Sequence, residues 1–454
     1  MDMHVLFLKA HYFIWFASLG GILQYVSVFG SQHTQQSTTN IGLLLTVMPF
    51  VTLIAKPVFC GIADHFNLHK FTLIASIFTT LLGYGLFAII PYLQQNIRWY
   101  LFCAFVLLAN SSSGVVTSLT DSIVMKEVTR TSVSYGSIRV FGSLGWGLFG
   151  LFSGVVNNNE LLPLNLPYLV PGIIMFAIFN IIDNLTIVFL LNTNSQQNAD
   201  KLNTEIQLRS VATVEVDNVE IKLQPKRVSV IREVFTAFRK YPSLFQYALI
   251  TIVIGILTAF HWSFFYLFIE KTIGQDTVLM GVCTFVQCFG GEIVFFLLAN
   301  RIVKAIGTSW SLNLSLLAFC VRYLWYAFVV TKPLRYILVI SEFTQGPAFG
   351  LFYCCMTSIA QEYAMKGAKE IEDANDECDS NRKDRYFATM QGIMSGCFEG
   401  AGLGIGSAIG GVIIDNWGFT LFWITGACIA VSAALFNFIV ELLKRRANSR
   451  KAKI

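Results

Sequence analysis

Charged residues are scarce in this chain. Only 13% of its 454 residues are Asp, Glu, Lys or Arg, whereas 55% are hydrophobic, and the mean hydropathy is +0.61. Soluble globular domains carry about 25% charged residues. The composition therefore excludes a soluble globular protein and predicts an integral membrane protein, whose constant partner is the lipid bilayer.

Motifs of enzyme chemistry are also absent. The sequence contains no HExxH, no nucleophile elbow and no ligand cluster with metal spacing, so we expect neither an enzyme nor a bound metal or cofactor. The first apolar run lacks the basic start and small-residue cleavage site of a signal peptide, and it is too long for one. We therefore expect it to be a retained helix.

Long apolar runs are what the sequence does have. A helix needs about 20 apolar residues to cross the hydrocarbon layer, and twelve runs meet that length. The predicted spans are 5–29, 41–63, 71–93, 99–125, 135–156, 167–191, 244–269, 278–300, 308–330, 335–360, 386–413 and 418–440. They predict an all-α fold, a bundle of twelve transmembrane helices.

The widest polar interruption divides these spans into six and six. It covers residues 192–243 and separates an N-terminal bundle, 1–191, from a C-terminal bundle with a short basic tail, 244–454. Two six-helix halves around a central loop are typical of secondary transporters in which each half pairs a three-helix unit with its inverted copy. The sequence therefore predicts two pseudo-symmetric halves joined by a cytoplasmic linker.

The last part of the linker 192–243 has helical periodicity. Apolar residues recur there at helical spacing, with charged residues between them: Ile231, Val234, Phe235 and Phe238. This pattern predicts an amphipathic helix at the membrane surface. The alternative is a disordered tether between the halves.

Lys and Arg residues predict the orientation, because they are enriched on the cytoplasmic side of multispan proteins. With both termini inside, the outer gaps hold only Arg98, Lys271, Lys332 and Arg335, and none of the ten cysteines. Both termini are therefore predicted to be cytoplasmic, and disulfides are not expected. The net charge of +5 reflects this anchoring, so nucleic acid is not an expected partner.

Five charged residues lie within or at the ends of the apolar runs: Asp121, Arg139, Glu292, Arg322 and Glu342. A charge at bilayer depth costs at least about 2.5–3.5 kcal/mol, so it is usually paired, hydrated or used in transport. These five residues are therefore the first candidates for a functional site.

Asp121 and Arg139 flank a short inner turn. Each is nine residues from Arg130 in the middle of that turn, which places both about 13 Å from it along antiparallel helices. They can therefore face each other as an ion pair. The pair is a candidate solute site, and the alternative is a structural pair that fixes helix register.

Glu292, Arg322 and Glu342 converge on one level in the second half. Glu292 and Arg322 are equidistant from Gly307 in an inner turn. Arg322 and Glu342 are likewise equidistant from Lys332 in an outer turn. An acid, a base and an acid near the middle of the bilayer suit a proton site, since the Arg stabilises one carboxylate while burial favours protonation of the other. A structural role is again the alternative.

Other residues in the spans are exceptional for their surroundings. Trp146 lies two helical turns after Arg139 on the same face, where an indole can stack on a sugar or nucleobase, although packing is the alternative. Four polar residues are candidates for lining a cavity, the alternative being hydrogen bonds between helices: Gln24, His261, Gln345 and Glu399.

Two kinds of residue are assigned no role in function. Lys56 and Asp183 lie near the inner ends of their spans, where a Lys can reach the interface and an Asp can find water. Glycines crowd two spans at spacings that predict close helix packing: Gly142, Gly145, Gly147, Gly150 and Gly154 in the fifth, and Gly402, Gly406 and Gly410 in the eleventh.

The segment 56–70, KPVFCGIADHFNLHK, resembles the loop motif between the second and third helices of the major facilitator superfamily. Gly61, Asp64 and Lys70 stand at motif positions, which implies a role for this loop in conformational change. The central basic and glycine positions of the motif are altered here, to His65 and Leu68.

The fifth span carries a second resemblance. Its segment 135–150, YGSIRVFGSLGWGLFG, is similar to the fifth helix of the lactose permease family and of the animal major facilitator superfamily domain-containing protein six. In the permease, the acid of the fourth helix and the Arg and Trp of this motif bind the sugar. Asp121, Arg139 and Trp146 stand at those positions, so the resemblance implies that they bind solute.

The C-terminal half continues this resemblance, through segments 341–361 and 400–422, which are similar to the tenth and eleventh helices of protein six and its relatives. The coupling Glu, Arg and His of the permease correspond to Glu292, Arg322 and Glu342. Gln345 stands where the permease has its second coupling carboxylate. The resemblance therefore implies coupling only if Glu342 or Glu292 carries the proton.

The sequence predicts a secondary active transporter that moves a small polar organic solute, such as a sugar or nucleoside, by alternating access. It would be a proton symporter if the triad titrates, and we expect a monomer. The alternative is a non-transporting membrane receptor or scaffold on a transporter fold, which Gln345 and the long cytoplasmic loops favour.

Overall fold

The structure is a computed structural model that describes residues 3–66, 68–131, 133, 135–188, 239, 241–372 and 390–451. Ten helices in this part of the chain are long and apolar enough to cross a membrane. One of them, Met390–Arg446, turns back at Gly418, where φ is +77°, and so makes two antiparallel crossings. A further helical run, from Leu338 to Glu372, brings the crossings to the predicted twelve.

The N-terminal half contains the first six crossings. Its elements are α1 (Met3–Gly20), the short 3₁₀ segment η1 (Leu23–Tyr25), α2 (Val26–Thr34), α3 (Thr38–Phe66), α4 (His69–Gly85), η2 (Leu86–Tyr92), α5 (Gln95–Thr131), α6 (Tyr135–Val156) and the helix Val170–Val188. Of the predicted linker 192–243, the described residues are 239 and 241–243, so the predicted amphipathic helix lies outside them.

The C-terminal half contains the other six crossings, and several are interrupted by π or 3₁₀ turns. Its elements are α9 (Pro242–Phe268), η3 (Ile269–Ile273), α10 (Thr277–Val286), η4 (Gln287–Glu292), α11 (Ile293–Ile306), α12 (Thr308–Phe328), η5 (Lys332–Ile337), α13 (Leu338–Ser341), η6 (Glu342–Thr344), η7 (Gly346–Leu351), α14 (Phe352–Glu372), η8 (Gly396–Gly402) and α16 (Leu403–Lys451).

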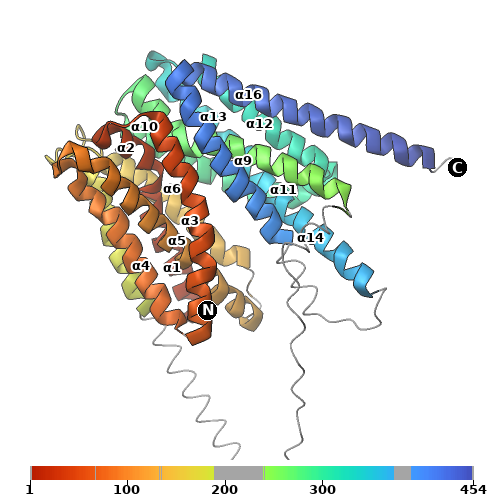
Figure 1. Cartoon of the computed structure of the whole chain (residues 1–454), viewed down its shortest axis with the longest axis horizontal. Helices are drawn as coiled ribbons and strands as arrows, with labels where there is room; N and C mark the ends of the chain where they lie inside the picture. Colours follow the sequence, from red (N-terminus) through yellow and green to blue (C-terminus); the bar gives the residue numbers. More distant parts are fainter. Residues whose placement is uncertain are drawn as a thin grey trace, which may run out of the picture.

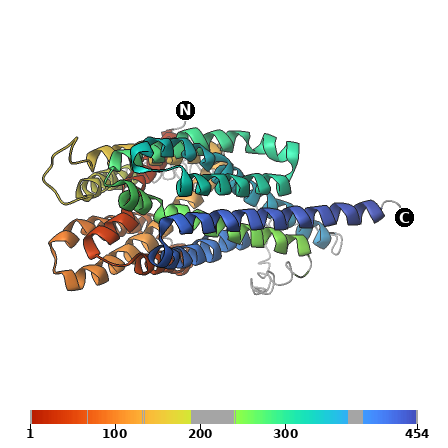
Figure 2. The same ribbon diagram turned by 90° about the horizontal axis from the view of Figure 1, so that it is seen from above.

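The two halves lie side by side, as two orthogonal views show (Figure 1 and Figure 2). Within the N-terminal half α1 packs against α6 and α4 against α5, and within the C-terminal half α16 packs against α9 and α12. The most extensive contacts between the halves are those of α3 with α16 and of α6 with α10, and α2 also packs against α9.

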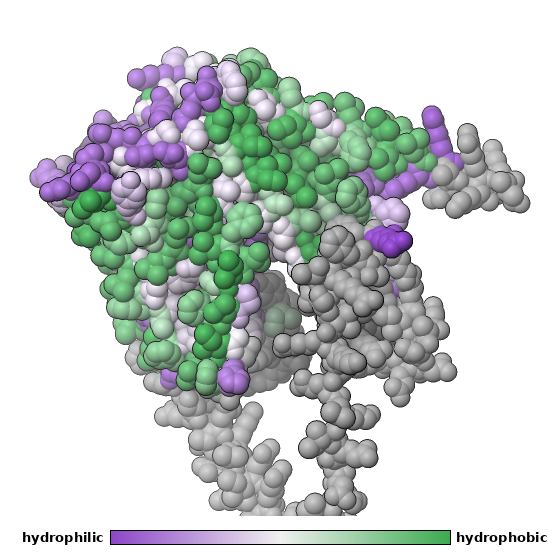
Figure 3. All heavy atoms as spheres, viewed as in Figure 1, coloured by the Kyte–Doolittle hydropathy of each residue, from purple (hydrophilic) through white to green (hydrophobic). Residues whose placement is uncertain are grey.

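Apolar side chains cover much of the face of both halves that Figure 3 shows. Leu53, Phe71 and Leu297 are 62%, 68% and 76% exposed, and many other large apolar side chains are exposed with them. A soluble monomer rarely shows apolar surface on this scale. This surface is therefore the part of the molecule that faces lipid.

Glycines allow the closest helix contacts, as predicted. A Cβ on Gly145 of α6 would lie 2.2 Å from the Phe13 carbonyl oxygen of α1, and one on Gly402 would lie 2.7 Å from the Cα of Gly255 in α9. Real Cβ atoms essentially never approach so near. Side chains at these positions would therefore push the helices apart.

Hydrogen bonds between the halves gather at the end of the molecule opposite to Pro242. At this end the Glu270 carboxylate of the C-terminal half accepts from the Gln32 amide and, at 2.8 Å, from the Tyr168 hydroxyl, both in the N-terminal half. Asp415 of α16 accepts from Thr39 at the start of α3. The ribbons diverge towards the other end (Figure 1).

Candidate functional site

A fully buried carboxylate, Glu342 of η6, lies at the centre of a polar cluster in the C-terminal half. It accepts hydrogen bonds from the Tyr326 hydroxyl at 2.5 Å and the Gln287 amide at 2.6 Å, and the His261 imidazole lies 3.9 Å away. Tyr326 belongs to α12, Gln287 to η4 and His261 to α9. The carboxylate therefore joins three helices that are remote in sequence.

Arg322 and Glu292 belong to the same region and are joined through Gln345. Arg322, which is fully buried, donates from Nε to Thr344 Oγ1 at 2.7 Å and from Nη1 to Gln345 Oε1 at 2.6 Å. The Gln345 amide donates in turn to Glu292 Oε1 at 3.1 Å. The structure thus brings the three charges predicted to share one level into one polar region, with Gln345 as the bridge.

Irregular helix geometry coincides with these polar residues. Single π turns in helices are frequent at functional sites, and short 3₁₀ turns mark hinges or strain. The residues in or next to such turns are Gln24 in η1, Gln287 and Glu292 in η4, Glu342 in η6, Gln345 before η7 and Glu399 in η8.

Asp121 and Arg139 meet in the N-terminal half through aromatic side chains of α1. The Tyr12 hydroxyl donates to the Asp121 carboxylate, and the Arg139 guanidinium lies over the rings of Phe16, at 4.3 Å, and Tyr12, at 5.7 Å. Tyr12 therefore contacts both predicted charges. Sequence reasoning missed Tyr12 and Phe16, because aromatic residues on an apolar span carry no signal that separates them from packing.

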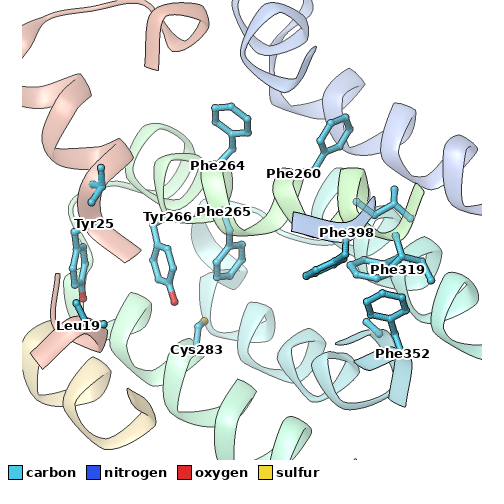
Figure 4. Packing of buried hydrophobic residues seen from close by; sticks show 14 of the residues in the cluster. Leu19, Tyr25, Phe260, Phe264, Phe265, Tyr266, Cys283, Phe319, Phe352 and Phe398 are labelled. Atoms are coloured by element: carbon cyan, nitrogen blue, oxygen red, sulfur yellow. The ribbon is translucent and has the colours of Figure 1, made fainter. Parts of the chain in front are cut away.

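Trp146 and Gln24 lie close to the boundary between the halves. Trp146 is half-buried, and the next residue, Gly147, lies against Cys288 of η4. Gln24 accepts a hydrogen bond of 2.6 Å from Thr284 of α10. The rings of Tyr25 and Tyr266 lie side by side with their centroids 5.8 Å apart (Figure 4). The Tyr266 hydroxyl is 2.5 Å from that of Thr284.

The remaining predicted residues are distributed as follows. His261, a predicted solute ligand, lies in the Glu342 cluster. Glu399 is exposed, and among the described residues it is not one of the hydrogen-bond donors to Glu342. Gly61 and Asp64 lie in the last turns of α3 and Lys70 in the first turn of α4, and a Cβ on Gly61 would have open space around it.

Comparison with known families identifies the chain. Residues 5–372 match the model of the MFS_1 like family, so the chain belongs to this family of the major facilitator superfamily. It is 23% identical over 349 residues to the uncharacterized transporter YwbF of Bacillus subtilis (strain 168), covering 77% of this chain and 76% of that protein. It is 26% identical over 148 residues to the maltose permease of Geobacillus stearothermophilus, covering 33% and 36%.

Solved structures match over nearly the whole chain. The nucleoside transporter NupG aligns with a TM-score of 0.70 and 14% identity, covering 97% of this chain and 99% of that one. A bacterial homolog of the human lysosomal transporter Spinster aligns with a TM-score of 0.62 and 13% identity, covering 97% of each chain. These matches confirm the predicted fold class. The family is one of membrane transporters for small molecules and not of enzymes, as predicted.

Proposed function

We propose that this transporter is a secondary active one that moves a small polar organic solute, such as a sugar or nucleoside, by alternating access, with both termini in the cytoplasm and a monomer as the working unit. Two similar proteins, a maltose permease and a nucleoside transporter, support this substrate class. The similarity of the fifth span to that of the lactose permease family supports it as well.

The contact of Tyr12 with both Asp121 and Arg139 is the observation that carries this proposal. Asp121, Arg139 and Trp146 are all half-buried. Charged groups within a span avoid lipid, because hydrocarbon cannot solvate them. We therefore assign these side chains to the cleft between the halves, where an acid and a guanidinium can bind hydroxyl groups and an indole can stack on a ring. Gln24 and His261 complete the proposed solute site.

Glu342 and Glu292 are the groups that we propose to carry a coupled proton. The Glu342 cluster offers a carboxylate surrounded by donors, and Arg322 supplies a fixed positive charge nearby. Gln345 cannot titrate, so its part is to connect Arg322 with Glu292. Glu399 is the exposed member of the proposed coupling set, and Gly61, Asp64 and Lys70 form the proposed conformational loop.

The direction of opening follows from the orientation predicted by the Lys and Arg residues. The hydrogen bonds of Glu270 and Asp415 close the end that is then extracellular. With the halves diverging at the other end, we assign this conformation to the inward-facing state of the transport cycle.

Uptake by proteoliposomes that contain the full chain tests the proposal. A panel of radiolabelled sugars, nucleosides and other polar solutes should contain at least one with saturable uptake. Arg139→Ala should abolish that uptake, whereas Arg301→Ala, which removes an exposed Arg from α11, should leave it unchanged.

Two outcomes would contradict the proposal. If Arg139→Ala left the solute flux intact, the assignment of Arg139 to the solute site would be wrong. The absence of saturable flux for every solute would instead favour the receptor or scaffold alternative.

A further inference from the structure

Two hydrogen bonds between consecutive residues join helices α1 and α5. His11 and Tyr12 of α1 lie opposite Thr120 and Asp121 of α5: the His11 Nε2 atom is 2.9 Å from Thr120 Oγ1, and the Tyr12 hydroxyl donates to Asp121. His11 is 1% exposed, whereas Asp121 is half-buried. The proposed solute site thus has a buried imidazole directly behind it.

The other ring nitrogen of His11 meets a buried carboxylate. His11 Nδ1 lies 2.7 Å from Asp183 Oδ1, and Asp183 is fully buried in the helix Val170–Val188. Among the described residues no side chain or backbone group hydrogen-bonds to Asp183 Oδ2 or to the amide of Asn180, one turn earlier and also fully buried. Buried polar atoms without a protein partner are exceptional and call for an explanation.

The hydrogen bonds of His11 are compatible with two protonation states. In both states Nδ1–H donates to Asp183. When His11 is neutral, the Thr120 hydroxyl donates to the lone pair of Nε2; when it is protonated, Nε2–H donates to Thr120 Oγ1. A hydroxyl serves equally as donor and acceptor, so a proton can bind or leave without the loss of a hydrogen bond. With Asp183 ionised, the charge of the His11–Asp183 pair changes from −1 to 0 when the proton binds.

We propose that His11 and Asp183 form a proton-binding site of the N-terminal half, separate from the Glu342 cluster. The new N–H bond forms at Nε2, and Thr120 turns from donor to acceptor. Because Thr120 and Asp121 are consecutive, this change takes place one residue from the solute site. Its effect on solute rests on the proposed transport function, but proton binding itself does not.

Other charged and titratable groups surround this site on the packed helices. His4 and Glu127 lie about two helical turns further along α1 and α5, with 3.5 Å between His4 Nδ1 and a Glu127 carboxylate oxygen. On the side of the proposed cleft lie Asp121 and the Arg139 guanidinium over Tyr12. Lys9 of α1 lies over the Phe141 ring of α6.

Nuclear magnetic resonance of the full chain in nanodiscs, with ¹⁵N-labelled histidine and no solute, tests the proposal. The sequence has six histidines, and the loss of one pair of ring signals in His11→Gln assigns those of His11. We expect these signals to change from the neutral to the charged form as the pH is lowered, because imidazole is the side chain that gains a proton in this way. In Asp183→Asn the midpoint of this change should move, because the neighbouring carboxylate is lost.

Thr120 provides a matched pair of variants. Thr120→Ser keeps the hydroxyl and should leave the pH midpoint of the His11 signals unchanged. Thr120→Val has nearly the same shape without the hydroxyl and should move that midpoint. A monodisperse elution profile shows that each variant is folded, and the Thr120 pair decides the question if Asp183→Asn does not fold. His11 signals that stay constant over the pH range, or that respond to Na⁺ instead, would overturn the proposal. Solute uptake is not measured here, so failure of this proposal is distinct from failure of the transport proposal.

Discussion

Asp415 of the C-terminal half caps the start of α3 in the N-terminal half through Thr39. Its Oδ2 atom accepts from both the backbone N–H and the hydroxyl of Thr39, each at 2.6 Å, and Oδ1 accepts from the backbone N–H of Thr38 at 3.0 Å. The first N–H groups of a helix have no partner within it. Here the Asp415 carboxylate of the other half is the hydrogen-bond acceptor for these N–H groups. The cap therefore exists only while this end of the transporter is closed.

Removal of this cap should favour opening at that end. Asp415→Ala leaves the first turn of α3 without its anion, a loss of about 1 kcal/mol for an exposed carboxylate at a helix N-terminus. The population open at this end should therefore rise by about fivefold. Spin labels at Leu164 and Trp417, both exposed, report that population as a longer distance between the halves.

Asn416→Ala is the control for this variant, because the Asn416 amide donates within its own helix, to the Val412 carbonyl oxygen. Its distance distribution should match that of the unchanged chain. An Asp415→Ala distribution that also matches would show that the cap does not hold the halves together.

Glu342→Gln should destabilise the folded protein. Tyr326 and Gln287 both donate to the carboxylate, and Gln has a single acceptor oxygen and an NH₂ group that would face one of these donors. A buried donor left without a partner costs about 1–3 kcal/mol. Thermal unfolding in detergent should show a Tm several degrees lower.

Glu399→Gln makes the same chemical change at an exposed position of η8 and should leave the Tm nearly unchanged. Equal effects of the two substitutions would contradict the assignment of Glu342 to a buried, fully partnered site.

Tyr12→Phe should weaken solute binding without removing the ring that lies under Arg139. The substitution takes away the hydroxyl that donates to Asp121, and the lost positioning should raise the KM by up to about tenfold with little change in the amount of folded protein. Uptake by proteoliposomes at varied solute concentration measures this.

Tyr84→Phe is the matched control, since the described residues provide no hydrogen-bond partner for the buried Tyr84 hydroxyl. Its KM should equal that of the unchanged chain. A Tyr12→Phe variant with the same KM would argue against a role for Asp121 in the solute site.

Gly145→Ala should impair folding or lower the Tm, because a Cβ there would come within 2.2 Å of the Phe13 carbonyl oxygen and separate α1 from α6. Gly400→Ala adds the same methyl group where nothing lies within 4 Å. It should be tolerated. The yield of monodisperse protein and its Tm compare the two, and a tolerated Gly145→Ala would mean that this contact relaxes easily.

Much of the fold was predictable from local sequence. The apolar runs had to form helices, since a chain in lipid must satisfy its backbone hydrogen bonds within each span. The number of crossings and their boundaries followed from run length, and Gly145 and Gly402 indicated where helices approach closely. Lys and Arg placement predicted the orientation, which stays a prediction.

For the candidate site, the sequence predicted only the depth of the charged residues in the membrane. Equal distances from a turn placed Glu292, Arg322 and Glu342 at one level, and the structure brings them into one region. Depth does not give the direction in which a side chain points around its helix. For that reason the sequence did not predict that His261 lies beside Glu342, or that Glu399 is exposed.

The sequence by itself determined that this chain is a bundle of membrane-spanning helices with a few costly charges at fixed depths, because hydrophobic length and helical rise are properties of each segment alone. Only the tertiary structure decided which of those charges meet. Asp183, which had no expected role, lies against His11, and Gln345 connects Arg322 to Glu292. Such contacts depend on which helices become neighbours and how each is rotated, and packing of the whole bundle sets both.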